Sequence, residues 1–340
     1  MTMQKRYDEI DLTKGMAIIL AVFGHAAPDA VKGFWIVGTD SLSASLHYLV
    51  YSFHMALFFA CSGFLLYPKF SMTKGVTDVV LKRFKKIMIP YFFLSFVYLF
   101  GKMFGGSLAD HQLTDNPFVG IMFGSSPCFG AWFLWCLFVM TLIVLCLRWL
   151  NLWLLFTIFI AISYIPVEYG ENYMGVAKVQ SGTMWLILGC IVRKYYDKIS
   201  GNVTIWLGLL AALILIALHI SRGVYDYGNH LVNHTVDMIK TLSGIVASFT
   251  LCYMIAYKTK DSLSYKSLKI CGEYCMDIYI ISMFILVSLR VLYVNGGLMN
   301  IIPYYVWLLI ATVLGVTLPL LLSKIVVRKV RWLRLLILGG

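Results

Sequence analysis

The chain has 340 residues, of which 60% are hydrophobic and only 13% are charged, whereas about 25% are charged in an average soluble protein. This composition cannot supply a water-facing surface, so it excludes a soluble enzyme, a disordered chain and a disulfide-stabilised scaffold. The eight cysteines lie mostly within apolar runs and show no Cys-x-x-Cys spacing, which indicates neither a zinc site nor a disulfide framework. The sequence therefore predicts an all-α, polytopic membrane protein.

Membrane-spanning helices are expected where about 20 consecutive residues are mostly apolar. Ten segments meet this condition, without an evident internal repeat or low-complexity tract. We therefore expect about ten transmembrane helices in a single domain, residues 1–340. The ten segments are residues 13–31, 46–67, 87–104, 129–147, 150–166, 179–195, 203–220, 236–257, 270–290 and 303–323.

The positive charges are distributed unevenly between the predicted loops. The net charge is +12, and cytoplasmic loops of membrane proteins are enriched in Lys and Arg. With the N-terminus inside, 21 of the 28 Lys and Arg residues lie in inner segments, and the outer segments hold only Lys32, Lys178 and Arg222. This asymmetry predicts that the N- and C-termini are both cytoplasmic. It also accounts for the basic charge without a nucleic-acid partner.

The N-terminal apolar segment has a competing interpretation. Residues 15–24 precede Ala26, Ala27 and Pro28, an arrangement that resembles a cleavable signal peptide. However, acidic residues at positions 8, 9 and 11 make a poor positively charged start for a signal. We therefore expect this segment to remain as the first transmembrane helix.

The first predicted helix carries three ionisable residues along one face. Because an α-helix turns by about 100° per residue, Lys14 lies about 20° from His25, and Asp11 lies about 40° from it on the other side. The rise of the helix places His25 about 16 Å beyond Lys14, past the bilayer midplane. Ionisable residues within a membrane are costly and indicate function. The alternatives are a packed His25 that donates to a carbonyl group and a Lys14 that only anchors the helix at the interface.

His54 lies on the second predicted helix, about 12 Å below its outer end. This depth is similar to that of His25, and a short loop joins the two helices. The two imidazoles could therefore meet within the membrane. A packing role for His54 is the alternative.

Other predicted helices carry further charged residues. Glu273 and Asp277 are one turn apart near the cytoplasmic end of the ninth helix, and Asp237 and Lys240 are spaced to pair on one face of the eighth. We interpret the second pair as structural. The sequence has no His-Glu-x-x-His, Gly-x-Ser-x-Gly or Walker motif, and we expect no bound metal.

A strongly basic segment opens the third predicted helix on its cytoplasmic side. It contains Lys82, Arg83, Lys85 and Lys86. Such a cluster can bind phosphate groups through charge-assisted hydrogen bonds. Attraction to anionic lipid headgroups explains the same charges equally well.

The order of these elements along the chain resembles the acyltransferase 3 family of membrane O-acyltransferases, which modify bacterial surface glycans. The similarity covers nearly the whole chain, and the linked order is more specific than any single element. The matching elements are Asp11, Lys14 and His25; Phe53-His54-Met55-Ala56-Leu57-Phe58-Phe59 with Ser62-Gly63; Arg83 and Lys86 followed by Pro90-Tyr91; Trp132-Phe133-Leu134; and the segment from Gly272 to Tyr279.

The chain departs from the family pattern at three positions. Lys14 stands where Arg is commoner, Ala56 replaces a usual Pro, and Ser282 stands where many relatives carry His. Some members also carry a fused extracellular SGNH hydrolase-like domain. The sequence ends at Gly340 without one, so we expect it to act alone or with a separate partner.

The resemblance implies an acyl-CoA-dependent O-acyltransferase, with acetyl-CoA the commonest donor and no permanently bound cofactor. The acceptor would be a hydroxyl of a surface polysaccharide or a lipid-linked glycan, and the location a bacterial inner membrane in contact with its lipids. Arg83 and Lys86, with Lys82 and Lys85, would bind the donor phosphates, and the donor arm would pass Lys14 to reach His25. Self-association into a homo-oligomer is left open.

The implied role of His25 is that of a general base that deprotonates the acceptor hydroxyl. Asp11 is expected to pair with Lys14 rather than with His25, because about three turns of helix separate it from the imidazole. A covalent acyl-His intermediate is an open alternative. A glycan or lipid-intermediate transporter with a polar path and a purely structural membrane subunit are the other two interpretations.

Overall fold

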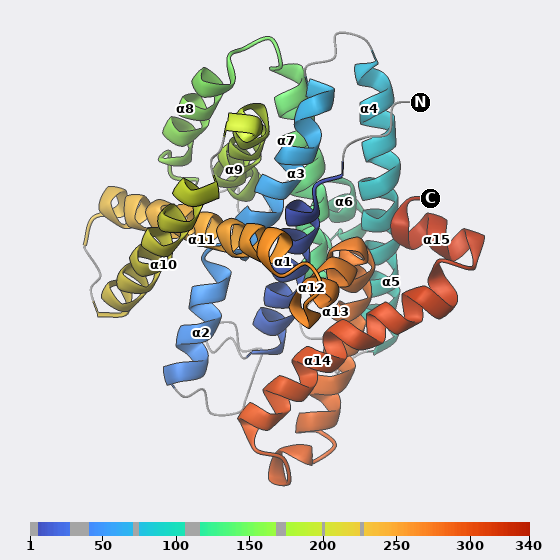
Figure 1. Ribbon diagram of the computed structural model, residues 1–340. Coiled ribbons are helices and arrows are strands. Elements are labelled where there is room, and N and C mark those ends of the chain that lie inside the picture. Colours follow the sequence, from blue (N-terminus) through green and yellow to red (C-terminus); the bar gives the residue numbers. More distant parts are fainter. Residues whose placement is uncertain are drawn as a thin grey trace. The chain divides into compact units, whose positions relative to one another are not determined.

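The computed structural model describes residues 6–27, 41–70, 75–105, 116–167, 175–198, 201–224 and 228–340. Every regular element within these residues is helical, which confirms the predicted all-α class (Figure 1). The predicted end of the first span at residue 31 and the alternative signal-cleavage position lie outside the described residues. The helices are α1 (Asp8–Ala26), α2 (Ser41–Tyr51), α3 (His54–Phe70), α4 (Val76–Arg83), η1 (Phe84–Met88), α5 (Ile89–Gly105), α6 (Pro117–Met122), η3 (Phe129–Ala131), α7 (Trp132–Cys146), α8 (Leu152–Ser163), α9 (Val176–Tyr195), η4 (Tyr196–Lys198), α10 (Gly201–Val224), α11 (His230–Lys258), α12 (Leu263–Glu273), α13 (Cys275–Val294), η5 (Leu298–Asn300), α14 (Tyr304–Leu322), η6 (Ser323–Val327) and α15 (Arg331–Leu338).

The chain divides into two compact units, each formed by two separate stretches of sequence. Unit 1 comprises Met1–Cys61 and Tyr195–Leu321, and unit 2 comprises Ser62–Lys194 and Leu322–Gly340. The expectation of one domain over residues 1–340 stays a prediction.

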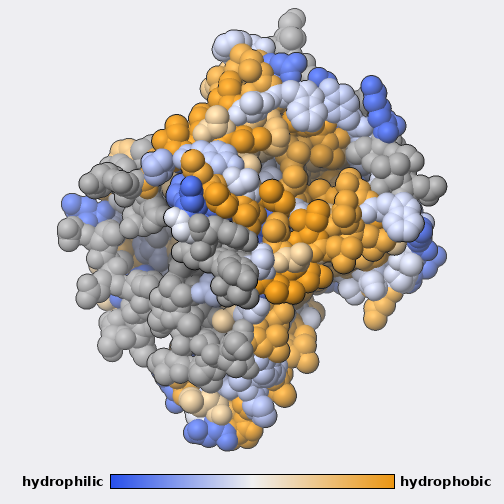
Figure 2. All heavy atoms as spheres, turned by 90° about the vertical axis from the view of Figure 1, so that its left-hand side faces the viewer, coloured by the Kyte–Doolittle hydropathy of each residue, from blue (hydrophilic) through white to orange (hydrophobic). Residues whose placement is uncertain are grey.

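Six helical segments are long and apolar enough to cross a membrane, judged by length and composition within the described residues. The helices α7 and α8 are also apolar but shorter, so ten spans and cytoplasmic termini stay predictions. Hydrophobic side chains cover much of the face seen in Figure 2. On α10, for example, the side chains of Trp206 and Leu213 are 74% and 67% exposed. A surface of this kind suits contact with lipid rather than with water. The six segments are Leu42–Pro68, Val76–Phe104, Thr204–Ser221, His230–Lys258, Cys275–Val294 and Tyr304–Val327.

Helix α1 is at the centre of unit 1, where it contacts α2, α11, α12 and α13. Two glycines allow an unusually close approach of α1 to α12. A Cβ atom added at Gly15 would overlap the carbonyl oxygen of Leu268, and one added at Gly272 would overlap the carbonyl oxygen of Asp11. The two backbones are therefore packed directly against each other at two levels.

The predicted ninth span, residues 270–290, is not one continuous helix. Helix α12 ends at Glu273, Tyr274 adopts φ −103° and ψ 17°, and α13 begins at Cys275. Glu273 therefore ends one helix and Asp277 lies in the first turn of the next, which corrects the expectation that both lie on a single helix. Gly272 immediately precedes the break, and glycine favours the helical state by about 1 kcal/mol less than alanine does.

Unit 2 has a comparable close contact between α3 and α9. A Cβ atom added at Gly63 would overlap the carbonyl oxygen of Leu186, and the Cys190 thiol donates to the carbonyl oxygen of Gly63 at 3.2 Å. Tyr91 of α5 is fully buried, and its hydroxyl donates to the carbonyl oxygen of Ile121 at 2.8 Å. These backbone and side-chain contacts hold α3 to α9 and α5 to α6 within unit 2.

An ion cluster joins the start of α1 to α12 in unit 1. Asp8 accepts hydrogen bonds from the Tyr265 hydroxyl at 2.7 Å and from the Lys269 ammonium at 3.1 Å. Burial raises the pKa of Asp8, but these two donors outweigh burial and hold it below the ordinary value of 3.8. The same bonds, with Tyr265 first, raise the pKa of Lys269 above its ordinary 10.5.

We predict that Gly272→Ala and Gly15→Ala each destabilise the protein by about 1–3 kcal/mol, because the added methyl group forces the α1 and α12 backbones apart. The midpoint of thermal unfolding in detergent should fall for both variants. Gly101→Ala is the matched control, because a Cβ atom there meets nothing within 4 Å and alanine favours a helix. Equal midpoints for Gly272→Ala and Gly101→Ala would contradict the packing argument.

We predict that the Asp8 cluster stabilises the protein fully above about pH 4 and that this contribution is lost as the pH falls through the lowered pKa of Asp8. Asp8→Asn should therefore lower the free energy of unfolding at pH 6–8 by less than about 1 kcal/mol, which is measured as a lower unfolding midpoint. The difference from the unmodified protein should shrink below pH 4. Asp261→Asn, at an exposed aspartate, serves as the control. A difference between Asp8→Asn and the unmodified protein that does not change with pH would show that the ionised carboxylate is not responsible.

Candidate functional site

The predicted stripe of ionisable residues lies on one continuous helix, because α1 runs without a break from Asp8 to Ala26. Its apolar members Ile18 and Ala21 are buried, and Lys14 and His25 are half-buried. The stripe therefore faces other helices of unit 1 rather than lipid.

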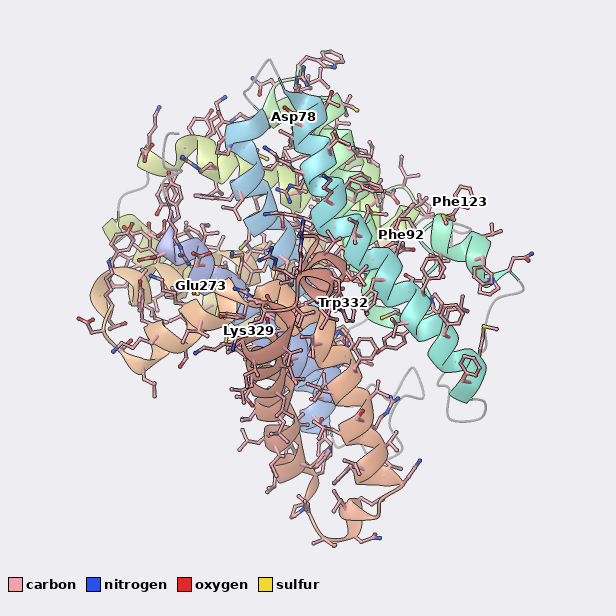
Figure 3. The ribbon with its side chains drawn as sticks, turned by 90° about the vertical axis from the view of Figure 1, so that its right-hand side faces the viewer. Asp78, Phe92, Phe123, Glu273, Lys329 and Trp332 are labelled. Carbon is pink, nitrogen blue, oxygen red and sulfur yellow. The ribbon has the colours of Figure 1, made fainter. Side chains whose placement is uncertain are left out.

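The Asp11 carboxylate is held between two cations. Lys14 Nζ lies 2.8 Å from Asp11 Oδ1, and Arg6 Nε lies 2.7 Å from Asp11 Oδ2. The expected pairing of Asp11 with Lys14 is therefore present. Arg6 also forms an ion pair with Glu273, so the network extends from α1 to a second helix. Glu273 is labelled at the end of α12 in Figure 3.

This network keeps Asp11 ionised. Burial raises the pKa of Asp11, but the charges and hydrogen bonds of Lys14 and Arg6 lower it by more than burial raises it. The net pKa of Asp11 therefore lies below the ordinary value of 3.8. The pKa of Arg6 is raised, mainly by its hydrogen bonds to Asp11 and Glu273. Asp11 is consequently a fixed negative charge beside Lys14 and cannot supply a proton at neutral pH.

A second carboxylate near the start of α1 is deeply buried. Glu9 is 2% exposed and accepts a hydrogen bond from the hydroxyl of Tyr196 in η4. Burial raises the pKa of Tyr196, and the bond to Glu9 raises it further. The phenol therefore stays a donor and stabilises the buried carboxylate. The sequence contained no local signal for this contact, because the two residues are far apart along the chain.

At the other end of the stripe, the His25 imidazole contacts α2. Nδ1 of His25 lies 3.0 Å from the hydroxyl oxygen of Tyr51, and the two rings meet edge to face with centroids 5.9 Å apart. Gly24 makes this approach possible, because a Cβ atom there would lie 2.6 Å from the Tyr51 ring. His25 is therefore oriented by a specific partner and is not simply packed in an apolar environment.

His47 supports the Tyr51 ring. The two rings are stacked with centroids 3.9 Å apart, and Nδ1 of His47 lies 3.1 Å from the carbonyl oxygen of Gly24. Since a carbonyl oxygen can only accept, Nδ1 of His47 carries the hydrogen. His47 and Tyr51 lie one turn apart on α2 and together hold the segment Gly24–His25 of α1.

His54 also borders Tyr51, with ring centroids 4.9 Å apart. The two imidazoles that were expected to meet, His25 and His54, thus both lie against the same tyrosine ring. His54 is fully buried, and its Nδ1 donates to the carbonyl oxygen of Val50 at 2.9 Å. This geometry gives His54 a structural contact at the junction between α2 and α3.

The backbone at that junction leaves the helical path at Ser52 and Phe53. The Thr241 hydroxyl of α11 donates to the carbonyl oxygen of Ser52 at 2.8 Å, which replaces part of the lost helical bonding. A Cβ atom at Gly244 would lie 2.3 Å from the Phe53 ring, so α11 also accommodates the aromatic side chain that the turn displaces.

A further polar cluster lies between α2, α10 and α11. Lys240 is 5% exposed, and its ammonium lies 3.0 Å from Nδ1 of His219; Nε2 of His219 lies 2.8 Å from the hydroxyl oxygen of Ser45. The expected pairing of Lys240 with Asp237 did not anticipate this bond, because His219 is on a different helix. The cluster links three helices of unit 1.

The basic segment lies in unit 2. Lys82, Lys85 and Lys86 are exposed, and Arg83 is half-buried. The segment runs from α4 into η1, a short π-helix over Phe84–Met88, and Pro90 follows in α5. A proline ring clashes with the carbonyl group four residues earlier, here that of Lys86, and the wider π-turn relieves this clash.

The sequence analysis predicted Asp11, Lys14, His25, His54 and the basic segment as site residues and did not name Tyr51 or His47, which the structure places against His25 and its helix. The sequence did contain a pattern that could have indicated these two residues. Positions 47 and 51 are one turn apart on a predicted helix, and both side chains carry polar atoms on a ring. Among the residues described by the structure, no group of three metal-ligating side chains is found.

Comparison with known proteins gives one result. A family model described as an acyltransferase domain matches residues 7–324, which cover both the α1 stripe and the basic segment. No curated protein and no solved structure matches the chain. The family match covers nearly the whole chain, and the protein therefore belongs to the acyltransferase 3 family.

Proposed function

We propose that the protein transfers an acyl group, most often acetyl, from acyl-CoA to a hydroxyl of a surface polysaccharide or a lipid-linked glycan. The observation that carries this proposal is the half-buried His25 imidazole, which Tyr51 orients at the end of a charged helix face. Family membership and the apolar helices favour a membrane acyltransferase over a transporter. The proposed location is the inner membrane of a bacterium, with both termini cytoplasmic.

His25 acts as the general base in this proposal. A neutral imidazole carries one hydrogen, so when Nδ1–H donates to the Tyr51 hydroxyl oxygen, Nε2 is the unprotonated nitrogen and the one that can accept a proton. Nε2 takes the proton of the acceptor hydroxyl as its oxygen attacks the thioester carbonyl carbon. The carbon–sulfur bond then breaks, and the proton passes to the departing thiolate.

The charged groups bind and position the donor. Lys82, Arg83, Lys85 and Lys86 bind the donor phosphates, for which guanidinium and ammonium groups are suitable partners. Lys14, fixed by Asp11, lies along the path of the donor arm. No permanently bound cofactor or metal takes part, and acyl-CoA is consumed as a substrate.

We predict that His25→Gln lowers acyl transfer by about 10²–10⁴-fold, because an amide cannot accept the proton at neutral pH. The measurement is CoA release by purified protein in liposomes that contain the glycan acceptor. His230→Gln removes an exposed imidazole and should leave turnover unchanged. Turnover of His25→Gln within twofold of the His230→Gln control would exclude His25 as the base.

We predict that Tyr51→Phe lowers kcat by about 10–100-fold, as expected when a partner that orients an active imidazole is lost, while KM changes little. The phenyl ring can still stack on His47, so the fold should be kept. Tyr48→Phe, at a half-exposed tyrosine on the same helix, is the control. A shift in the pH profile of kcat in Tyr51→Phe, with no shift in Tyr48→Phe, would show that Tyr51 acts as a positioning residue. Unchanged kcat and pH profile would remove it from the mechanism.

A further inference from the structure

The C-terminal helix α15 is attached to the basic segment within unit 2. It contacts α5, and Gly339, which ends it, has a left-handed backbone with φ 72°. A Cβ atom at Gly339 would overlap the carbonyl oxygen of Lys85 and lie 2.5 Å from Cα of Lys86. Only glycine fits this position, so the end of α15 lies directly on η1.

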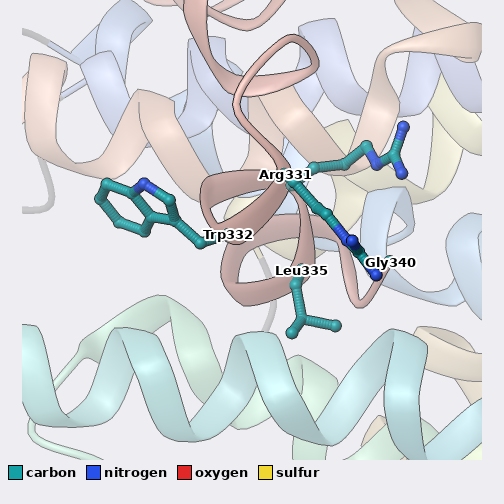
Figure 4. Close-up of a pocket in the computed structure, with 5 residues that line it drawn as sticks. Arg331, Trp332, Leu335 and Gly340 are labelled. Atoms are coloured by element: carbon teal, nitrogen blue, oxygen red, sulfur yellow. The ribbon is translucent and has the colours of Figure 1, made fainter.

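A hollow of about 580 Å³ opens beside this contact (Figure 4). Leu335 points from α15 toward the neighbouring helix, while Trp332 and Arg331 extend to either side. The volume is within the range of sites for small ligands, about 300–1,000 Å³, and the exposed lining of the hollow is almost entirely apolar, which suits an aromatic ring rather than a phosphate group. The residues that line it are Arg331, Trp332, Arg334, Leu335 and Gly340.

The cations here have no acidic counterpart in the part of the chain that the structure describes. Arg331 and Arg334 are exposed, as are Lys85 and Lys86 on the adjoining η1, and none of the four forms an ion pair there. Because Gly339 lies against Lys85 and Lys86, the arginines of α15 add positive charge beside that of the basic segment. An exposed group of cations without acidic partners offers a surface to which an anion can bind.

The arginine and tryptophan side chains indicate which class of anion this surface can bind. Guanidinium groups bind phosphate oxygens through two parallel hydrogen bonds. Trp332, 61% exposed, offers an indole face on which a purine ring can stack. An anionic lipid headgroup would use the arginines in the same way, and an indole is also common at a membrane interface, so the test below separates the two sources of phosphate.

We infer that α15 completes the donor site, with Arg331 and Arg334 binding phosphate groups of an adenosine phosphate and Trp332 stacking on its adenine. This inference rests on the proposed function, since the donor acyl-CoA carries such a group. Helix α15 lies beyond residues 7–324 matched by the family model, so its role does not follow from family membership. A lipid headgroup is the competing source of phosphate.

The test uses the full chain in nanodiscs of phosphatidylcholine, with CoA binding measured by calorimetry. Arg331→Ala/Arg334→Ala should raise the Kd for CoA about tenfold or more. The Kd of Arg331→Lys/Arg334→Lys should lie between that of the double alanine variant and that of the unmodified protein. Lys258→Ala/Lys266→Ala removes two exposed cations from unit 1 and should leave the Kd unchanged. Trp332→Leu should raise the Kd for CoA about fivefold or more but not that for 4′-phosphopantetheine, which lacks the adenine.

The outcomes separate the inference from the function on which it rests. If the unmodified protein fails to bind CoA, both are wrong. If it binds CoA and the arginine and tryptophan variants bind equally well, only the role of α15 is wrong. A defect that appears solely as weaker association with phosphatidylglycerol-containing vesicles would assign the arginines to lipid. If the double alanine variant does not fold, Trp332→Leu and the double lysine variant decide the question.

Discussion

The first helix carries charged and titratable side chains into a protein that is otherwise mostly apolar, and each such group needs a partner that offsets the cost of removing it from water. Asp11 has this compensation from Lys14 and Arg6, Glu9 from Tyr196, and His25 from Tyr51. The partners come from α2, from η4, from α1 itself and from the residues just before it. The polar groups of one helix thus determine which other helices must surround it in unit 1.

The close contacts follow from the same requirement. Glycines allow neighbouring elements to approach α1 closely, at Gly272 toward the Asp11 backbone and at Gly24 toward the Tyr51 ring. The helical path is also interrupted near these partners, at Ser52–Phe53 and at Tyr274. An interrupted helix exposes carbonyl groups, and the structure supplies donors for them, such as Thr241 for Ser52. Irregular backbone in this protein is therefore paired with the polar groups of the site.

Helical geometry explains which of these features were predictable. The alignment of Asp11, Lys14 and His25, and the pairing of the first two, depend only on spacing along one helix, and the structure has both. Arg6 with Glu273 and Lys240 with His219 join residues distant in the sequence, and no local pattern specifies such pairs. The break at Tyr274 was missed because hydropathy averaged over a span does not register a single residue with non-helical angles. Tyr51 was predictable in principle from its one-turn spacing to His47.

The proposed general base and the proposed donor-binding cations belong to different units of the chain. The imidazole and its partners belong to unit 1, whereas the basic segment and α15 belong to unit 2. The chain passes from one unit to the other three times: inside α3 after the His54 region, at the end of α9, and at the end of α14. Motifs close together in the sequence therefore serve different units, while α1 and α12, far apart in the sequence, form one packed pair. This arrangement explains why the linked order of motifs identifies the family better than any single motif, since each motif alone describes only part of one unit.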